Sequence, residues 1–354
     1  MYKILAINLG STSSKIAYYE DDICKVKANI EHPADEISKF GHFMEQDEYR
    51  RSYITEFLRD NNIVMEELDA IVSRGGHTRP IESGVYKISE LMMEEQASGK
   101  FGQHPCDLGS KIAYKMCNDI YALPLVVDPP VTDEFEDISR LSGHPLLERK
   151  SKFHALSHKA TAKRYARENN LNYEKLNLIV AHIGGGVSVA AHLKGRMIDG
   201  DNGLEGDGAY STNRTGGLPA GDLVNLCFSG DYSHDQVKKM INGNGGLMAY
   251  VGSNDVKEIQ EIAKNDEKVA LYLEGMIYQI SKQIGSYATV LSGKVDAILI
   301  TGGIAYSELI VEKIKRRCSF IAPIVVYPGE NEMDSLARGA WEALLGEVNI
   351  RELD

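Results

Sequence analysis

A strand–turn–strand pattern occurs twice in this chain and constrains its fold more than any other feature of the sequence. Near the N-terminus an apolar run at residues 4–7 enters the turn 8–15, and a second apolar run at 16–19 follows directly. At 178–198 an apolar run again enters a glycine turn and leaves as a second strand, in the sequence LIVAHIGGGVSVAAHL. Both copies lead through a further turn to a third strand. Two copies of one β-hairpin unit predict an internally duplicated α/β fold.

Other segments fit this plan, because each is an apolar run that ends in polar or glycine-rich sequence. Strands are predicted within 69–77, 123–131 and 296–305, and a long helix at about 265–291. The segment 323–345 is expected to form a strand, a turn and a closing amphipathic helix. Polar residues follow the carboxyl ends of these strands, which is where open α/β sheets bind ligands.

Composition limits the class of protein. The chain has 354 residues, 43% of them hydrophobic, which favours two domains. The formal net charge of -12 argues against a general nucleic-acid binder. The five cysteines form no CxxC pair, so neither a zinc site nor a disulfide framework is indicated. Since there is no apolar run of about 18 residues and no leader-like N-terminus, we expect a cytoplasmic protein with no membrane partner.

The N-terminal turn NLGSTSSK contains more hydroxyl groups than a hairpin requires. A tight hairpin needs only Gly or Asn for its backbone. Backbone N–H groups, hydroxyls and one lysine are what a loop that wraps phosphates would offer. A decorated hairpin is an equally weighted alternative, and the turn fits neither the dinucleotide-binding motif nor the P-loop motif.

Three later motifs also allow two interpretations. The turn after His182 and the Thr301-Gly-Gly turn suit a backbone that approaches a nucleotide, or simple close packing. His154 and His158 are one helical turn apart, but no HExxH glutamate or third ligand accompanies them. A structural pair, or a pair with one catalytic member, is therefore favoured over a metal site. Arg214 lies in the polar loop STNRTGG, where it is either solvated or faces a phosphate.

Together these motifs resemble the acetate and butyrate kinase family, the acetokinases, within the sugar kinase, Hsp70 and actin superfamily. INLGSTSSK resembles the family's N-terminal phosphate motif, FHALSH its FHGTSH segment, and HIGGGVS its HLGNGSS segment. LEGDGAYSTNRTGG resembles its LEG…TRSG segment, and TGGIAYS its adenosine motif. The resemblance runs nearly from end to end. It implies a duplicated ribonuclease-H-like (actin-like ATPase) α/β fold, with two domains around a cleft, that binds a small carboxylate, ATP or ADP, and Mg²⁺.

The resemblance also implies roles for individual residues. The residues with implied catalytic roles are Arg74, Asp128, His154 and Arg214. Phosphate-binding and nucleotide-binding roles fall on Asn8, Ser11, Ser13, Lys15, His182, Gly184, Gly186, Gly302 and Gly303. Magnesium ligation falls on Asn8, Asp128 and Glu332, and the substrate pocket on Phe153 and Gly203.

Three positions depart from the family pattern. Gly185 stands where acetate kinases have Asn, which removes one phosphate contact. The family's arginine strand has a longer spacing before its Gly pair, so Arg79 is the alternative to Arg74. Gly203 stands where acetate kinases have a proline that lines the methyl pocket. Loss of that ring predicts a substrate larger than acetate.

The implied activity is reversible phosphoryl transfer between ATP and butyrate, or a branched short-chain acid. An acetate or propionate kinase, a sugar kinase of the same superfamily and a non-catalytic nucleotide-binding scaffold are the alternatives. A carboxylic acid titrates near ~4 and is ionised at neutral pH, so no general base is needed. Asp128 is therefore better interpreted as a metal or orientation residue. A sugar kinase would need a base Asp in a polar sugar site, and the sequence offers no such cluster.

The expected domains are 1–150, an N-terminal α/β domain, and 151–333, a C-terminal nucleotide-binding domain. The final segment, 334–354, is expected to pack back on the first domain. The family resemblance and the apolar helix at 265–291 also predict a homodimer or a higher homo-oligomer.

Overall fold

The computed structural model describes residues 1–329 and 331–353 and divides into two compact units. Unit 1 comprises Met1–Asp133 and Asn331–Asp354, and unit 2 comprises Glu134–Glu330. The expected ranges 151–333 and 334–354 include residues 330 and 354, which lie outside the described residues.

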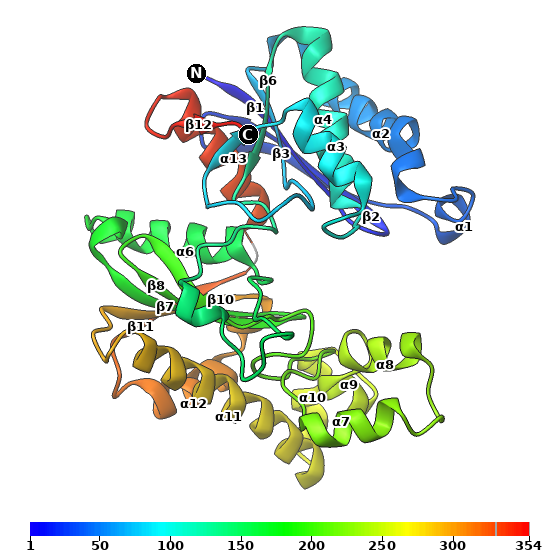
Figure 1. Cartoon of the computed structure of the whole chain (residues 1–354). Helices are drawn as coiled ribbons and strands as arrows, with labels where there is room; N and C mark the ends of the chain where they lie inside the picture. The colour runs from blue at the N-terminus through cyan, green and yellow to red at the C-terminus, as the bar shows by residue number, and fades with distance from the viewer. Residues whose placement is uncertain (330, 354) are drawn as a thin grey trace. The chain divides into compact units, whose positions relative to one another are not determined.

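Unit 1 contains a seven-stranded sheet in the order β12-β5-β6-β4-β1-β2-β3 (Figure 1). Its strands are β1 (Lys3–Leu9), β2 (Ser13–Glu20), β3 (Ile23–Glu31), β4 (Ala70–Ser73), β5 (Val85–Lys87), β6 (Leu123–Val127) and β12 (Ile350–Arg351). Its helices are α1 (Ala34–Ile37), α2 (Asp47–Asp60), α3 (Glu90–Ser98), α4 (Cys106–Ile120) and α13 (Glu332–Leu344), with the short helical turns η1 (Phe43–Gln46) and η2 (Met65–Glu67).

Side chains along β1 point alternately to the two faces of this sheet, and a helix packs on each face. Leu5 and Ile7 share a buried core with Leu108 and Ile112 of α4. Helix α13 packs on β1 and β6 from the opposite face (Figure 1). Both faces of the central strands are therefore covered, which explains their nearly continuous apolar sequence.

Unit 2 contains a five-stranded sheet in the order β11-β10-β7-β8-β9. Its strands are β7 (Asn177–Ile183), β8 (Val187–Leu193), β9 (Arg196–Gly200), β10 (Ala297–Gly302) and β11 (Ile324–Pro328). Its helices are α5 (Asp137–Arg140), α6 (Ala155–Glu168), α7 (Ala220–Cys227), α8 (His234–Ile241), α9 (Gly246–Val251), α10 (Val256–Ala263), α11 (Glu267–Val290) and α12 (Glu308–Cys318), with the turns η3 (Tyr173–Lys175) and η4 (Gly303–Tyr306).

The two faces of this second sheet are covered in the same way. Ile179 of β7 belongs to the core that α11 and α12 fill, whereas Leu178 packs with Ala162 of α6. None of the described helices is both long enough and apolar enough to cross a membrane.

Five strands of each unit follow one topology, which confirms the expected duplication. In unit 1 the order β3-β2-β1-β4-β6 has antiparallel pairs among β1, β2 and β3, and parallel pairs joining β1, β4 and β6. In unit 2 the order β9-β8-β7-β10-β11 repeats these orientations strand for strand. The predicted strands within 69–77, 123–131 and 296–305 are β4, β6 and β10, and the long helix at 265–291 is α11.

The compact units divide after Asp133, whereas the sequence suggested residue 150. Glu134 explains the difference, because it accepts a hydrogen bond of 2.7 Å from the backbone N–H of Met197 and forms a 2.7 Å ion pair with Lys159. Both partners lie in unit 2, so the segment before residue 150 is bound to unit 2. Helix α13 packs on strands of unit 1, where the closing helix was expected.

Candidate functional site

In unit 1, three of the candidate residues lie at one edge of the sheet. Strands β1, β4 and β6 are adjacent and parallel, so their carboxyl ends meet. Asn8 lies near the end of β1, Arg74 follows β4 directly, and Asp128 follows β6 directly. The arrangement is the one in which α/β sheets bind ligands.

Glu332, the first residue of α13, connects two of these side chains. Its Oε2 atom accepts a hydrogen bond of 2.8 Å from Asn8 Nδ2, and its Oε1 atom lies 3.5 Å from Arg74 Nη2. Arg79, the alternative to Arg74, instead donates through Nε to Glu95 of α3 at 2.6 Å. The structure therefore groups Arg74, and not Arg79, with Asn8 and Glu332.

Asp128 is buried and has a left-handed backbone, with φ of 40°. Its Oδ1 atom accepts a hydrogen bond of 2.8 Å from the N–H of Gly84, and its own N–H donates to the carbonyl of Gly84 at 3.0 Å. A non-glycine residue in this conformation is unusual, and such residues cluster at functional sites. The carboxylate thus fixes the loop before β5.

The N-terminal turn that contains Ser11, Ser13 and Lys15 is held by Arg50 of α2, a residue that sequence analysis missed. The Arg50 side chain is fully buried, and burial lowers its pKa. It donates through Nη1 to the carbonyl of Ser13 at 2.9 Å and through Nη2 to the carbonyl of Ser11 at 3.2 Å. Ser11 and Lys15 are exposed, so the turn presents a hydroxyl and a cation to solvent while Arg50 fixes its carbonyls.

Two groups in unit 1 could be considered for metal binding. Asn8, Asp128 and Glu332 offer the oxygen atoms that Mg²⁺ prefers, so their chemistry fits the expected ion. The structure also brings His77, Cys106 and Asp107 together, with ligand atoms within 4.8 Å of one another. Asp107 already accepts backbone hydrogen bonds from His77 at 2.7 Å and His104 at 2.8 Å. Burial raises the pKa of the Cys106 thiol to about 12, which disfavours the thiolate that a metal needs, so we interpret this second group as structural.

In unit 2, His154 and His182 stack face to face, with ring centroids 4.0 Å apart and an interplanar angle of 14°. His154 immediately precedes α6, and His182 lies near the end of β7. Each ring is held at Nδ1 by a serine hydroxyl. Ser188 Oγ lies 2.8 Å from Nδ1 of His154, and Ser157 Oγ lies 2.9 Å from Nδ1 of His182.

Arg214 reaches the glycine turn that follows β7. Its Nη1 atom donates to the carbonyl of Gly203 at 3.0 Å. A Cβ placed on Gly186 would come within 2.0 Å of Arg214 Nη1 and 3.2 Å of His154 Cε1. Glycine at 186 is therefore what allows the guanidinium and the imidazole to approach the same turn.

The charge of Arg214 is incompletely compensated. Its Nε atom is buried and finds no hydrogen-bond partner within residues 1–329 and 331–353, and burial lowers the pKa of its guanidinium. Arg214 as a whole is half-buried and its side-chain hydrogen bond goes to a neutral carbonyl, so a phosphate or carboxylate would supply the charge-assisted hydrogen bonds that its guanidinium lacks among the described residues. The local electrostatics thus favour an anion beside Arg214.

The other glycine candidates differ in their surroundings. The N–H of Gly184 donates to the carbonyl of Gly186 at 2.9 Å, which closes the turn. Gly302 has φ of 96°, and a Cβ there would lie 2.4 Å from the carbonyl of Ile183, so close packing requires this glycine. Gly303 has nothing within 4 Å of a built Cβ, which leaves its surface open.

The two residues expected in the substrate pocket are both tightly packed. Phe153 is 8% exposed and stacks on Phe135 at 6.0 Å between ring centroids. A Cβ on Gly203 would lie 2.7 Å from the carbonyl of Val187, so the missing side chain does not leave open space in that direction. Close packing against Val187 explains why residue 203 is a glycine. Its role in a substrate pocket stays a prediction.

A sequence profile of the acetokinase family matches residues 135–322. The chain is 47% identical over 352 residues to butyrate kinase 2 of Clostridium acetobutylicum and 45% identical over 351 residues to a probable butyrate kinase of Bacteroides thetaiotaomicron, with 99% of every chain covered. The chain belongs to the acetokinase family. The acetokinase fold is confirmed by the crystal structure of Porphyromonas gingivalis acetate kinase, which matches with a TM-score of 0.80 and 20% identity over 98% of this chain and 100% of that one.

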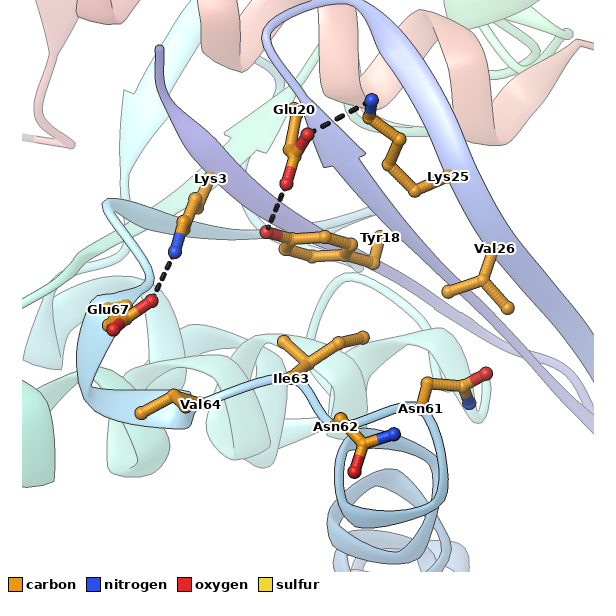
Figure 2. A pocket seen from close by; sticks show the side chains of 10 residues that line it. All are labelled: Lys3, Tyr18, Glu20, Lys25, Val26, Asn61, Asn62, Ile63, Val64 and Glu67. Atoms are coloured by element: carbon orange, nitrogen blue, oxygen red, sulfur yellow. Dashed lines mark hydrogen bonds and ion pairs between the residues drawn. The ribbon is translucent and has the colours of Figure 1, made fainter.

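This acetokinase also has a hollow of about 400 Å³ in unit 1, and Figure 2 shows the side chains that line it. Lys3 pairs with Glu67, and Lys25 pairs with Glu20, so its charges compensate one another. In the β1–β2 ladder Lys3 lies opposite Glu20, five residue pairs away from the end where Asn8 lies opposite Lys15. The hollow is therefore at the other end of these strands from Asn8 and Lys15.

Two residues of this acetokinase were missed for different reasons. The role of Ser188 could have been predicted from the sequence, because a hairpin closed by the glycine turn places residue 188 opposite residue 182. The β7–β8 pair has this register. The role of Arg50 could not be predicted in this way, because an arginine on an amphipathic helix is normally solvated, and only the folded chain buries it.

Proposed function

We propose that this acetokinase is a butyrate kinase, which transfers the γ-phosphoryl group of ATP reversibly to butyrate or a branched short-chain acid. Identity of 47% to butyrate kinase 2 over 99% of both chains supports the proposal. The structural observation that carries it is the half-buried Arg214 guanidinium, which lies beside His154 in the space that a Cβ on Gly186 would fill.

The reaction needs positioning and positive charge more than covalent chemistry. A carboxylate oxygen of the acid attacks the γ-phosphorus, the bond from that phosphorus to the bridging oxygen breaks, and ADP leaves. No proton is removed, because the acid is already ionised. Arg214 and Arg74 would stabilise charge on the equatorial oxygens of the phosphoryl group, and His154 would donate a hydrogen bond to one of them.

The remaining residues would bind the nucleotide and its ion. The N-terminal turn, with Ser11, Ser13 and Lys15, offers hydroxyl and cationic donors to phosphates. The glycine turns with Gly184 and Gly186, and with Gly302 and Gly303, would let the backbone approach the nucleotide, and His182 would hold the phosphoryl group together with His154. Asn8, Asp128 and Glu332 would hold Mg²⁺, which neutralises phosphate charge when bound.

A hydroxamate assay for acyl phosphate with ATP and Mg²⁺ tests this function directly. Acetate, propionate, butyrate, isobutyrate and valerate would be compared by kcat/KM. We expect a four-carbon acid to exceed acetate by at least ~10-fold, since one-methylene discrimination runs about 1–3 kcal/mol. Acetate ranking first would overturn the chain-length preference and leave the carboxylate kinase intact. Phosphorylation of sugars, or ATP binding without acyl phosphate, would favour the sugar kinase or the scaffold instead.

The two arginine assignments have a matched test. Arg214→Ala and Arg74→Ala should each lower kcat by about 10³-fold with little change in nucleotide affinity, as for other phosphoryl-transfer arginines. Arg79→Ala is the control, because Arg79 pairs with Glu95 and should leave kcat within a few-fold. A loss of kcat in Arg79→Ala, with normal turnover in Arg74→Ala, would show that Arg79 and not Arg74 is the first catalytic arginine.

The chain is also proposed to form a homodimer or a higher homo-oligomer. Helix α11 gives partial support, because it buries residues such as Leu273 and Ile277 in its own unit yet exposes Leu271 and Tyr278. Helix α7 gives stronger support, since its apolar sequence AGDLVNLC is fully described and contains no buried residue.

A further inference from the structure

His158 is a fully buried histidine that the proposed chemistry does not use. Its Nε2 atom lies 3.0 Å from Ser188 Oγ, and its Nδ1 atom has no hydrogen-bond partner among the residues that the structure describes. Burial lowers the pKa of His158 well below its usual value and the neighbouring His182 lowers it further, while an interaction with the backbone of Ser188 opposes them only in part. The ring is therefore neutral near pH 7, with one N–H and one bare nitrogen.

The unpartnered Nδ1 atom determines which nitrogen of His158 carries the proton. An N–H on Nδ1 would be a buried donor without an acceptor, and such donors are rarer in folded proteins than buried acceptors without a donor. The proton therefore belongs on Nε2, where it is donated to Ser188 Oγ. Ser188 then accepts from His158 and retains its own hydroxyl proton for another acceptor.

The other neighbour of the Ser188 hydroxyl is Nδ1 of His154, at 2.8 Å. Ser188 is itself fully buried, and among the described residues these two imidazoles are the hydrogen-bond partners of its hydroxyl. A hydroxyl has one proton to donate. Its oxygen could accept from both rings, but the buried hydroxyl proton would then have no acceptor, so we infer that Ser188 donates to His154 and that Nδ1 of His154 is the bare nitrogen.

We propose that Ser188 is a positioning residue that, supported by His158, fixes His154 in the tautomer with its proton on Nε2. His154 then enters the reaction as a hydrogen-bond donor at Nε2, which is what a negatively charged phosphoryl oxygen requires. The consequence for catalysis rests on the proposed kinase function, whereas the tautomer is a property of the folded chain alone. A serine that merely fills space between two rings would leave both tautomers of His154 open.

The tautomer can be measured without an activity assay. In protein labelled with ¹⁵N-histidine, long-range proton–nitrogen correlation spectra distinguish a bare nitrogen from a protonated one, and His154→Gln identifies the signal of His154. We expect wild-type protein near pH 7.5 to show bare Nδ1 and protonated Nε2 at His154. In Ser188→Ala the signal should change to a mixture of the two tautomers. A wild-type His154 protonated on Nδ1, or an unchanged tautomer in Ser188→Ala, would overturn the proposal.

Kinetics supply the second readout. Ser188→Ala should lower kcat about tenfold or more while the KM values for butyrate and ATP change less than about twofold, because a fixed donor matters most in the transition state. Ser188→Thr keeps the hydroxyl and should restore the wild-type tautomer and much of kcat. If Ser188→Ala does not fold, the wild-type spectrum and the threonine variant still decide the question.

Tyr173→Phe is the matched control. It removes a hydroxyl that lies 2.8 Å from Nδ1 of His192, another fully buried histidine, and it should leave the His154 signal and kcat unchanged. If Tyr173→Phe changed the His154 tautomer as much as Ser188→Ala, general loosening of the core would explain both, and the assigned role would fail. If the tautomer is as expected but no acyl phosphate forms with any acid, the proposed function fails and the positioning by Ser188 stands.

Discussion

At the scale of single residues, a substitution at Gly186 is expected to change activity without changing stability. A methyl group there would come within 2.0 Å of Nη1 of Arg214, the end of a flexible side chain that can move aside at little cost. We therefore expect Gly186→Ala to fold with a melting temperature close to wild type, while kcat falls by about 10²-fold or more, because the guanidinium is displaced from the turn. Thermal denaturation and the hydroxamate assay on the same sample test both parts.

Gly185→Ala is the control for that experiment. A Cβ at 185 meets nothing within 4 Å, so the added methyl is free of contacts in the next position of the same turn. It should leave kcat within a few-fold of wild type. If the two variants were equally impaired, the loss would come from the backbone of the turn and not from the position of Arg214.

Asp201 provides a second residue-scale prediction, which concerns pH. Burial is the main cause that raises the pKa of this carboxyl to about 7, and its oxygens accept hydrogen bonds from Tyr287 and from the N–H of Val189. The nearby charged groups are Asp207, which raises the pKa, and Arg149, which lowers it. Since the folded chain binds this proton more tightly than the unfolded chain, Asp201 contributes stability at low pH that is lost between about pH 4 and 7.

Asp201→Asn tests this assignment, because asparagine is always neutral. The melting temperature of the variant relative to wild type should increase as pH rises from about 4 to 7 and stay constant above that, over a range worth a few kcal/mol at most. Melting curves recorded at intervals between pH 4.5 and 8.5 give the difference. Parallel curves for the two proteins across this range would show that Asp201 titrates normally.

At the scale of elements, the apolar runs predicted the strands, because period and length are local properties. No local feature of the sequence indicates that segment 134–150 is attached to unit 2, because what attaches it is a long-range pair, Glu134 with Lys159. The features of the candidate site also fall into those that local sequence predicts and those that it does not. Glycine turns and the His182–Ser188 pairing follow from sequence, whereas the burial of Arg50 and the salt bridge between Arg74 and Glu332 depend on contacts between distant segments.

The Glu134–Lys159 pair yields the prediction for this scale. The side chains of Lys159 and Glu134 are 2% and 6% exposed, and Lys159 Nζ also donates to the carbonyl of Gly195 at 2.6 Å. Lys159→Met should reduce the free energy of unfolding by about 3–5 kcal/mol, because it leaves Glu134 buried with its charge unpaired. Adding Glu134→Gln removes that charge and should recover part of the loss, as measured by denaturant unfolding.

Lys264→Met is the control for the buried pair. Lys264 forms an exposed pair with Glu261 at 2.7 Å, and its loss should cost no more than about 1 kcal/mol. If the double variant were less stable than Lys159→Met alone, the buried pair would owe its effect to the packing of Glu134 and not to its charge.

At the scale of the whole molecule, duplication explains why two units of different sequence share one strand order, and it leaves α7 to α10 as an addition within unit 2 between β9 and β10. In this addition Phe228, which follows α7, is 86% exposed, and Val224 is 55% exposed. Apolar side chains that gather on one short helix are typical of interfaces between protein chains.

If α7 forms such an interface, light scattering at micromolar concentration should give the mass of a dimer or a larger assembly for wild-type protein. Phe228→Asp should weaken the assembly by at least about tenfold in dissociation constant, because a buried aromatic anchor contributes about 2 kcal/mol or more. Phe320→Asp is the matched control, since Phe320 is 83% exposed and lies beyond α12, and it should leave the mass unchanged. A monomeric wild-type protein would rule out the assembly. An unchanged mass for Phe228→Asp beside a reduced mass for Phe320→Asp would move the interface from α7 to the end of α12.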